Sequence, residues 1–273
     1  MPGLFRHKGW LAAGVMAATC ALAFTGVASA THPANTKPPL KHININLNDT
    51  EALRTGAVFF MHTCAACHSL QGLRFQSLAS PLHLDDKQVE KLIMVSTRRP
   101  LDTIVSPMPE TLAKGYFGIE PPDLTDELHL RSADWVYTYL TSFYADPTRP
   151  TGANNVVFHN VAMPDVFAHL QGWQSPVMKP GFRFDKPAQI AMGVEPLTKG
   201  TMTPEQFDGL AKDLVTFLAY AANPHQQLSQ QIGFWVLIGL AIFIVLSYLI
   251  YRLYWRDIVM PHGQRWWSYW KKR

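Results

Sequence analysis

Two cysteines and a histidine stand together in the sequence as Cys64-Ala65-Ala66-Cys67-His68. A Cys-x-x-Cys-His run is the pattern of covalent haem attachment, in which both thiols add to the haem vinyl groups as thioethers. One helical turn can place both sulfurs at the porphyrin edge and the histidine ring beneath the iron. The spacing therefore predicts one haem c held by Cys64, Cys67 and His68, and a redox dithiol or a disulfide is the alternative.

The ligand opposite His68 decides between electron carriage and catalysis. An open iron position binds small molecules or peroxide, whereas a methionine closes the position and raises the reduction potential. Met163 and Met192 both lie in stretches that can fold over a haem, and Pro164 restricts the backbone beside the first. Met61 lies too close to the attachment motif to reach the opposite face. The candidates are Met94, Met108, Met163, Met178, Met192 and Met202.

The first thirty residues have the pattern of an export signal. Arg6, His7 and Lys8 precede an apolar stretch, and Ala28-Ser29-Ala30 fits a cleavage site for small residues. We therefore expect a signal peptide over residues 1–30 and a mature start at Thr31, with a retained N-terminal membrane anchor as the alternative. Cys20 leaves with the signal, so Cys64 and Cys67 are the cysteines of the mature chain.

The motif needs a scaffold, and the sequence predicts a mostly helical one. A helix capped at Asn48 or Asp49 leads into the cysteines, and Thr203-Pro204-Glu205-Gln206 is a strong start for another that ends at Pro224. Further helices are expected over about 85–95 and 132–144 from their apolar spacing. Residues 96–126 are expected to be mostly loop, and residues 145–200 long ordered loops, because both stretches are rich in proline.

One long apolar segment follows the soluble part. Residues 232–251 carry no charge, and twenty residues of helix span the roughly 30 Å hydrocarbon core of a bilayer. The tail, residues 252–273, is basic, so the positive-inside bias places it in the cytoplasm. We expect a haem domain over residues 31–231 in the periplasm, anchored by one pass through the cell (inner) membrane.

The charge is unevenly distributed along the chain. Of 24 basic and 20 acidic residues, two basic ones lie in residues 1–30, and six basic and one acidic lie in residues 252–273. The remaining 16 basic and 19 acidic residues give the body a slight negative balance. A basic protein is therefore a more suitable polar partner than nucleic acid.

In their order and combination, several motifs resemble the cytochrome c1 family of the cytochrome bc1 complex, most of all its proteobacterial branch. They read Cys-Ala-Ala-Cys-His-Ser, Pro-Pro-Asp-Leu, Asp-Trp-Val-Tyr-Thr-Tyr-Leu, Asn-Val-Ala-Met-Pro and Pro-His before a single span. The resemblance extends over nearly all of residues 40–256. The chain departs from it at Tyr116-Phe117, where some members carry two asparagines, and at the glutamines after Pro224. The matched stretches are residues 64–69, 121–124, 134–140, 149–164 and 224–225, with Arg131.

The resemblance implies roles for further residues. Met163 would be the axial methionine of a His/Met-ligated haem, and Met192 remains its competitor. Pro121 and Pro122 would pack on the haem, with a plain turn as the alternative. Arg131 would face a propionate, with a surface charge as the alternative, and Trp135 would pack the haem or belong to the core.

The resemblance also implies the fold, the partners and the function. The fold would be a cytochrome c-like haem domain with long loops and one C-terminal transmembrane helix. The chain would be an electron carrier, without an enzymatic activity of its own, in the ubiquinol–cytochrome c reductase. It would take electrons from the Rieske iron–sulfur protein and pass them to a soluble cytochrome c. Cytochrome b would be its membrane neighbour, and the complex would be dimeric.

Three other functions fit the residues. The chain could carry electrons for another respiratory complex, such as a terminal oxidase. A haem catalyst or sensor would leave the sixth iron position open. A structural anchor would join Cys64 and Cys67 in a disulfide.

Overall fold

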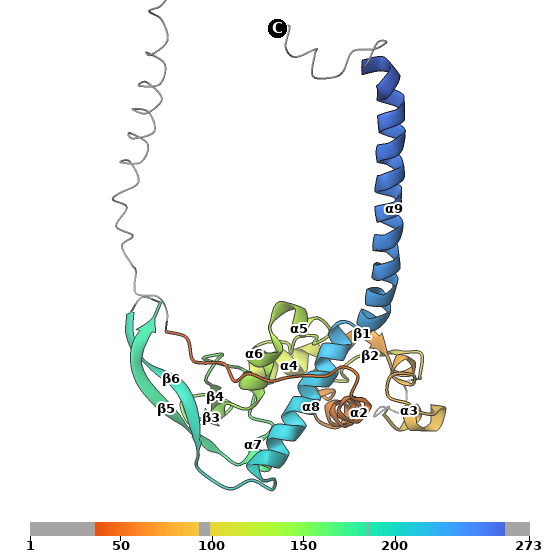
Figure 1. The fold of residues 1–273 in the computed structure, drawn as a ribbon. Helices are drawn as coiled ribbons and strands as arrows, with labels where there is room; N and C mark the ends of the chain where they lie inside the picture. Colours follow the sequence, from red (N-terminus) through yellow and green to blue (C-terminus); the bar gives the residue numbers. More distant parts are fainter. Residues whose placement is uncertain (1–35, 93–98, 185, 260–273) are drawn as a thin grey trace, which may run out of the picture.

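The computed structural model describes residues 36–92, 99–184 and 186–259, and it is mainly helical (Figure 1). Three two-stranded antiparallel sheets, β1–β2, β3–β4 and β5–β6, accompany the helices in this described part. The helices are α2 (Thr50–Phe59), α3 (Asp86–Leu92), α4 (Glu110–Phe117), α5 (Glu127–Leu130), α6 (Ala133–Leu140), α7 (Ala168–Gln171), α8 (Pro204–Ala222) and α9 (Gln226–Val259), with a π-helix at Phe60–Cys64 and a 3-10 helix at Phe75–Leu78. The strands are β1 (Leu70–Arg74), β2 (Thr103–Ile104), β3 (Phe143–Ala145), β4 (Ala153–Asn155), β5 (Gln174–Arg183) and β6 (Lys186–Pro196).

The core forms where α2 packs closely on α8. The Asp49 side chain accepts a hydrogen bond from the Ala52 amide at 3.1 Å and so caps α2, as predicted. A Cβ atom on Gly56 would lie 2.2 Å from the backbone oxygen of Asp213, so this glycine permits the close approach. Further along, the rings of Phe60 and Phe217 lie 5.7 Å apart. The contact fixes the helix that leads into the cysteines.

The start predicted for α8 is confirmed. Thr203 and Gln206 form a reciprocal capping box, and Pro204 occupies the first helical position. The helix ends at Ala222, before Pro224. Its buried apolar face includes Phe207, Leu214, Val215, Phe217 and Leu218.

The helix predicted over residues 132–144 ends four residues early, at Leu140. Beyond it, Phe143–Ala145 pairs with Ala153–Asn155 as the β3–β4 sheet. The Asn155 amide donates to the Tyr139 carbonyl at 2.8 Å, so one of the last carbonyls of α6 is satisfied by a side chain from the neighbouring strand. A tertiary contact replaces the next helical turn, which the spacing of apolar residues could not reveal.

The loop predicted over residues 96–126 contains one regular helix, α4. Its start follows Pro109, and Gly118, with φ of 74°, ends it in the left-handed region. The prolines of this stretch flank the helix and do not interrupt it. The helix predicted over 85–95 is observed over Asp86–Leu92, and its remainder, like Met94, lies outside the described residues.

The largest correction concerns residues 145–200, which were expected to be loops. Two long strands, β5 and β6, form a hairpin that curves around one side of the body (Figure 1). Proline usually argues against a strand because it cannot donate a ladder hydrogen bond. In a two-stranded ribbon each strand has an unpaired edge, so Pro176, Pro180 and Pro187 are accommodated.

The apolar segment forms a single helix, α9, that projects away from the body (Figure 1). It extends beyond the predicted residues 232–251 at both ends. Residues Leu228–Arg256 are long and apolar enough to cross a membrane, with a mean hydropathy of 2.5 in the most apolar window, and that window packs against no other part of the described chain.

Candidate haem-binding site

The cysteine motif follows α2 without a break. The chain passes from α2 into a π-helical turn over Phe60–Cys64, and the Cys64 carbonyl then accepts hydrogen bonds from the amides of Cys67 at 3.0 Å and His68 at 2.8 Å. This turn brings both cysteines and the histidine to one place. Both thiols are half-buried, and they are not joined in a disulfide.

The two thiols are poorly suited to act as a redox pair. Burial, followed by the neighbouring Cys67 thiol, raises the pKa of Cys64 to about 12. Burial also raises the pKa of Cys67. A reactive dithiol needs a thiolate with a lowered pKa, so these environments favour the protonated thiols instead.

The His68 ring is held by one nitrogen and offers the other. Its Nδ1 lies 2.8 Å from the carbonyl oxygen of Pro122, and because a carbonyl only accepts, Nδ1 carries the proton and donates. Burial lowers the pKa of His68 below its ordinary value, although the Pro122 carbonyl, Glu127 and Asp123 act in the opposite direction. The neutral ring therefore presents Nε2 as the atom that can bind a metal.

Residues 121–125 are fastened to the chain that follows His68. The Leu124 amide donates to the Ser69 carbonyl at 2.9 Å, and the Asp123 carboxylate accepts from the Gln71 amide at 2.8 Å. Pro121 is half-buried and Pro122 is exposed. The segment thus holds the Pro122 carbonyl against the imidazole, a role for this proline that the sequence did not indicate.

Arg131 and Trp135 lie together on and just before α6. The guanidinium carbon of Arg131 lies 3.9 Å from the centre of the Trp135 ring, and its Nε lies 2.8 Å from Glu127. The Glu127 carboxylate also raises the pKa of His68. This one carboxylate therefore acts on both His68 and Arg131, the residue expected to face a haem propionate.

Met163 lies in the loop between β4 and α7, beside the aromatic rings on α6. The Tyr139 hydroxyl donates to the Met163 sulfur at 3.4 Å, and the Tyr139 ring stacks on Trp135 with centres 5.3 Å apart. Phe158, which is 44% exposed, meets both rings edge-on. Tyr139, Phe158 and Glu127 were not predicted as site residues, although Tyr139 lies one helical turn after Trp135 and shares its face of the helix.

The other methionines lie elsewhere. Met192 occupies the bulge in β6, where the register shifts between the pairs Val177–Gly193 and Met178–Ala191. Met178 is exposed on β5, Met202 packs against the main core before α8, and Met61 is buried within that core. Met108 is half-buried after β2.

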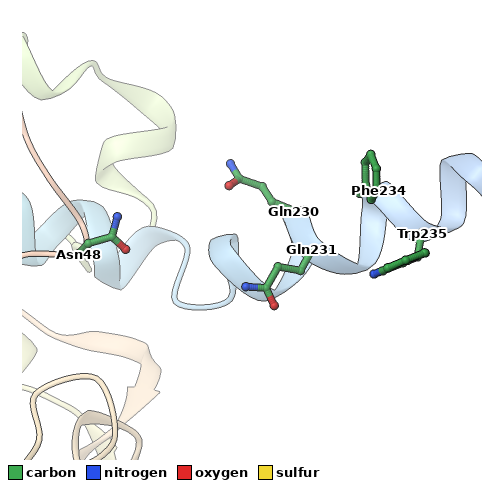
Figure 2. A pocket seen from close by; sticks show the side chains of 5 residues that line it. All are labelled: Asn48, Gln230, Gln231, Phe234 and Trp235. Carbon is green, nitrogen blue, oxygen red and sulfur yellow. The ribbon is translucent and has the colours of Figure 1, made fainter.

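The donor atoms fit a haem better than a simple metal ion. Two unjoined thiols, an imidazole with a free Nε2 and a thioether held by a hydroxyl match the donors of a His/Met haem c. Within residues 36–92, 99–184 and 186–259, no group of three His, Cys, Asp or Glu side chains converges as zinc or calcium ligands would. An open pocket lies apart from this site, between Asn48 and the first turns of α9 (Figure 2).

The site, and the one helix of membrane-spanning length among the described residues, are those of a membrane-anchored, haem-carrying electron-transfer protein. Within that class, the chain belongs to the Cytochrome C1 family, whose model matches residues 42–258. It is 41% identical over 219 residues to cytochrome c1 of Allochromatium vinosum, covering 80% of this chain and 89% of the relative. It is 35% identical over 228 residues to a protein of Nitrosomonas europaea named ammonia monooxygenase gamma subunit, covering 83% and 92%. The mitochondrial cytochrome c1 of Schizosaccharomyces pombe is 27% identical over 231 residues, covering 77% and 68%.

Proposed function

We propose that the chain carries one haem c, attached through Cys64 and Cys67 and ligated by His68 and Met163. The observation that carries this proposal is the His68 ring, which donates from Nδ1 to a backbone carbonyl and leaves Nε2 free directly after the two thiols. When bound, the haem would supply a one-electron ferric–ferrous couple. The thiols would hold its edge, and the imidazole and thioether would close both iron positions.

The residues around these ligands would orient the group and exclude water. Pro121 and Trp135 are half-buried beside the ligand-bearing segments, and Tyr139 and Phe158 add aromatic surface. Arg131 is held by Glu127 and Trp135 with its charge beside this surface, which suits a propionate partner. A dry, apolar setting with closed coordination favours electron transfer over binding of small molecules.

We assign the chain to the cytochrome bc1 complex, where it would accept electrons from the Rieske iron–sulfur protein and pass them to a soluble cytochrome c. Membership of the Cytochrome C1 family supports this assignment. Cytochrome b would lie beside α9, and the complex would be dimeric. Purification of the intact membrane complex, with visible spectra and identification of its subunits, tests the assignment. Absence of cytochrome b from the purified complex would contradict it.

The topology proposed with this function has three parts. Residues 1–30 would be removed, residues 31–231 would lie in the periplasm, and residues 252–273 would lie in the cytoplasm. Within residues 36–92, 99–184 and 186–259, one helix is of membrane-spanning length, and it supports the crossing proposed for residues 232–251. N-terminal sequencing of the membrane-isolated protein should give Thr31, and a start at Met1 or Pro2 would mean that the leader is a second anchor.

A second candidate is an electron-carrier subunit of a different membrane enzyme. The relative named ammonia monooxygenase gamma subunit matches this chain over most of both lengths, which keeps the candidate open. The same purification separates the two, because the second candidate predicts another enzyme in place of cytochrome b. A catalyst or sensor, by contrast, would bind carbon monoxide in its reduced form at neutral pH.

A further inference from the structure

The far end of the β5–β6 hairpin exposes aromatic side chains. Phe184 is 80% exposed and Phe182 is 37% exposed, and Pro180 and Pro187 beside them are also exposed. Phe184 has a φ of 49°, in the left-handed region where a bulky residue is strained. A strained, exposed aromatic residue at a turn is a candidate for a binding role.

The aromatic end is held in a fixed position. The Thr36 amide donates to the Phe182 carbonyl at 3.0 Å, and the Phe182 amide donates to the Thr36 hydroxyl at 3.0 Å. A Cβ atom on Gly181 would lie 2.7 Å from that hydroxyl, so the glycine permits the contact. At the other end of the ribbon, the Gln174 side chain donates to the Phe143 carbonyl at 2.9 Å. Both ends of the hairpin are therefore tied to other parts of the chain.

The same end lies on the side of the body from which α9 projects. In Figure 1 the hairpin curves back until its turn is level with the first turns of α9. Those turns carry Trp235, which is 70% exposed and lines the pocket of Figure 2 with Gln231. Tryptophan is enriched where a spanning helix leaves the hydrocarbon core, so a membrane surface at Trp235 would lie level with this end of the hairpin.

Basic side chains surround these aromatic ones. Lys179 and Lys186 are exposed on the two strands, Arg183 is half-buried, and Lys37 is exposed beside Thr36. Asp185, which lies outside the described residues, is the one acidic residue of the sequence from Lys179 to Ile190. We propose that this end of the hairpin docks on the surface of the anchoring membrane, with Phe182 and Phe184 among the headgroups of anionic phospholipids and the lysines near their phosphates.

Two fluorophore positions at opposite ends of the hairpin test the proposal. Attached haem would occupy Cys64 and Cys67, so Pro187→Cys and Leu197→Cys each give one labelled site in the mature full-length protein. Leu197 is 60% exposed and follows Pro196, at the end of the hairpin opposite the turn. In nanodiscs of phosphatidylglycerol, a quencher on the lipid headgroup should quench the label at 187 several-fold more than the label at 197. Phosphatidylcholine, high salt or a Phe184→Ser change should each reduce the difference.

Equal quenching at both positions would overturn the proposal. So would strong quenching that is insensitive to lipid charge and to Phe184→Ser. If the label at 187 is shielded only in the assembled complex and not by lipid, the hairpin binds another subunit and the membrane assignment is wrong.

A separate contact leads to a second inference, which rests on Met163 as the proposed ligand. The Tyr139 hydroxyl donates to the Met163 sulfur at 3.4 Å. Trp135 stacks on the Tyr139 ring and Phe143 meets it edge-on with centres 5.1 Å apart, while Asn155 bonds to its carbonyl. The hydroxyl is thus fixed by contacts that do not involve the sulfur.

We infer that Tyr139 is a positioning residue that orients the Met163 sulfur and raises the reduction potential. A thioether sulfur has two lone pairs, so it can bind iron with one and accept the hydroxyl with the other. The hydrogen bond withdraws electron density from the sulfur, which disfavours ferric iron more than ferrous iron. By holding one lone pair of the sulfur, the hydroxyl also fixes the direction of the lone pair that would bind the iron.

A matched pair of tyrosines on α6 tests this role. Tyr139→Phe removes the hydroxyl beside Met163, and Tyr137→Phe removes one that bonds to the Asp208 carboxylate on α8. In the haem-loaded protein, Tyr139→Phe should lower the potential and alter the far-red sulfur-to-iron absorption band, and Tyr137→Phe should do neither. If Met163→Leu abolishes that band but Tyr139→Phe changes neither readout, the inference fails and the ligand assignment stands. If Met163→Leu leaves the band intact, both fail.

Discussion

The proximal side of the site, around His68, and the distal side, around Met163, are held in different ways. His68 follows its helix directly, and its ring is fixed by a backbone carbonyl in a segment that is itself bonded to residues 69–72. Met163 lies in a loop, where it accepts from the Tyr139 hydroxyl and packs on a small buried cluster of Phe143 on β3, Ala153 on β4 and Val161 in the loop. The proximal side is therefore built mainly from hydrogen bonds to the backbone of one segment, and the distal side from contacts between side chains. Substitutions around His68 should therefore have local effects, whereas substitutions around Met163 should disturb several neighbouring side chains together.

The largest effect is expected from the proximal cysteines. Changing both Cys64 and Cys67 to alanine removes the thioethers, so the chain should lose all haem after denaturing electrophoresis. A haem stain on the gel measures this, and Cys20→Ala serves as the control that should keep full staining. Staining that persists in the double variant would refute covalent attachment.

The next effect separates the two distal candidates. Met163→Leu keeps the apolar volume nearly constant but removes the thioether. It should abolish the far-red sulfur-to-iron band, lower the potential and admit carbon monoxide. Met192→Leu, on the bulge of β6, should change none of these. Exchanged outcomes would move the distal loop to residues 185–202.

A stability test addresses the scaffold of the proximal side. Gly56→Ala places a Cβ atom 2.2 Å from the Asp213 backbone oxygen, so α2 and α8 must separate. We expect a loss of about 1–3 kcal/mol in the free energy of unfolding, as for other overpacked contacts. Gly115→Ala on α4 has open space around its Cβ and should be neutral or gain up to about 1 kcal/mol. Denaturant titration of the two variants measures the difference, and similar midpoints would contradict this view of the α2–α8 contact.

A smaller effect concerns acid and the distal side. Hydrogen bonds from Thr148 and Asn154 lower the pKa of Asp146 in the turn between β3 and β4. A carboxyl with a folded-state pKa below its ordinary value of about 3.9 stabilises the fold above that value, and the contribution is lost as pH falls through the folded-state pKa. Thermal midpoints should fall slightly over that acidic range in the parent and less in Asp146→Asn. If the thermal midpoints of the two proteins fall equally with pH, the Asp146 carboxylate does not contribute to stability.

The smallest effect concerns the surface of the body. Its slight negative balance predicts that a basic soluble cytochrome c associates more slowly as salt rises, because exposed charges are screened over about 8–10 Å at moderate ionic strength. Stopped-flow rates at several salt concentrations measure this. A flat dependence would indicate that apolar contact dominates.

Much of the helical scaffold could be predicted from the sequence. The caps at Asp49 and Thr203 and the apolar segment are local signals, and each was found where expected. The β5–β6 hairpin was missed because its prolines interrupt the alternation of apolar and polar residues by which a strand is recognised. The end of α6 was missed because a contact from Asn155, and not the local sequence, terminates it.

The sequence by itself determined the Cys-x-x-Cys-His motif, the helix that precedes it, the C-terminal apolar helix and, through motif order, the family. These depend on spacing and composition over short distances, where local physics is sufficient. The fold was needed to bring Pro122 to His68 and Tyr139 to Met163, and to carry the end of the hairpin round to the side from which α9 projects. The two contacts join residues that are distant in sequence, and they form only when the helices have packed around the shared core.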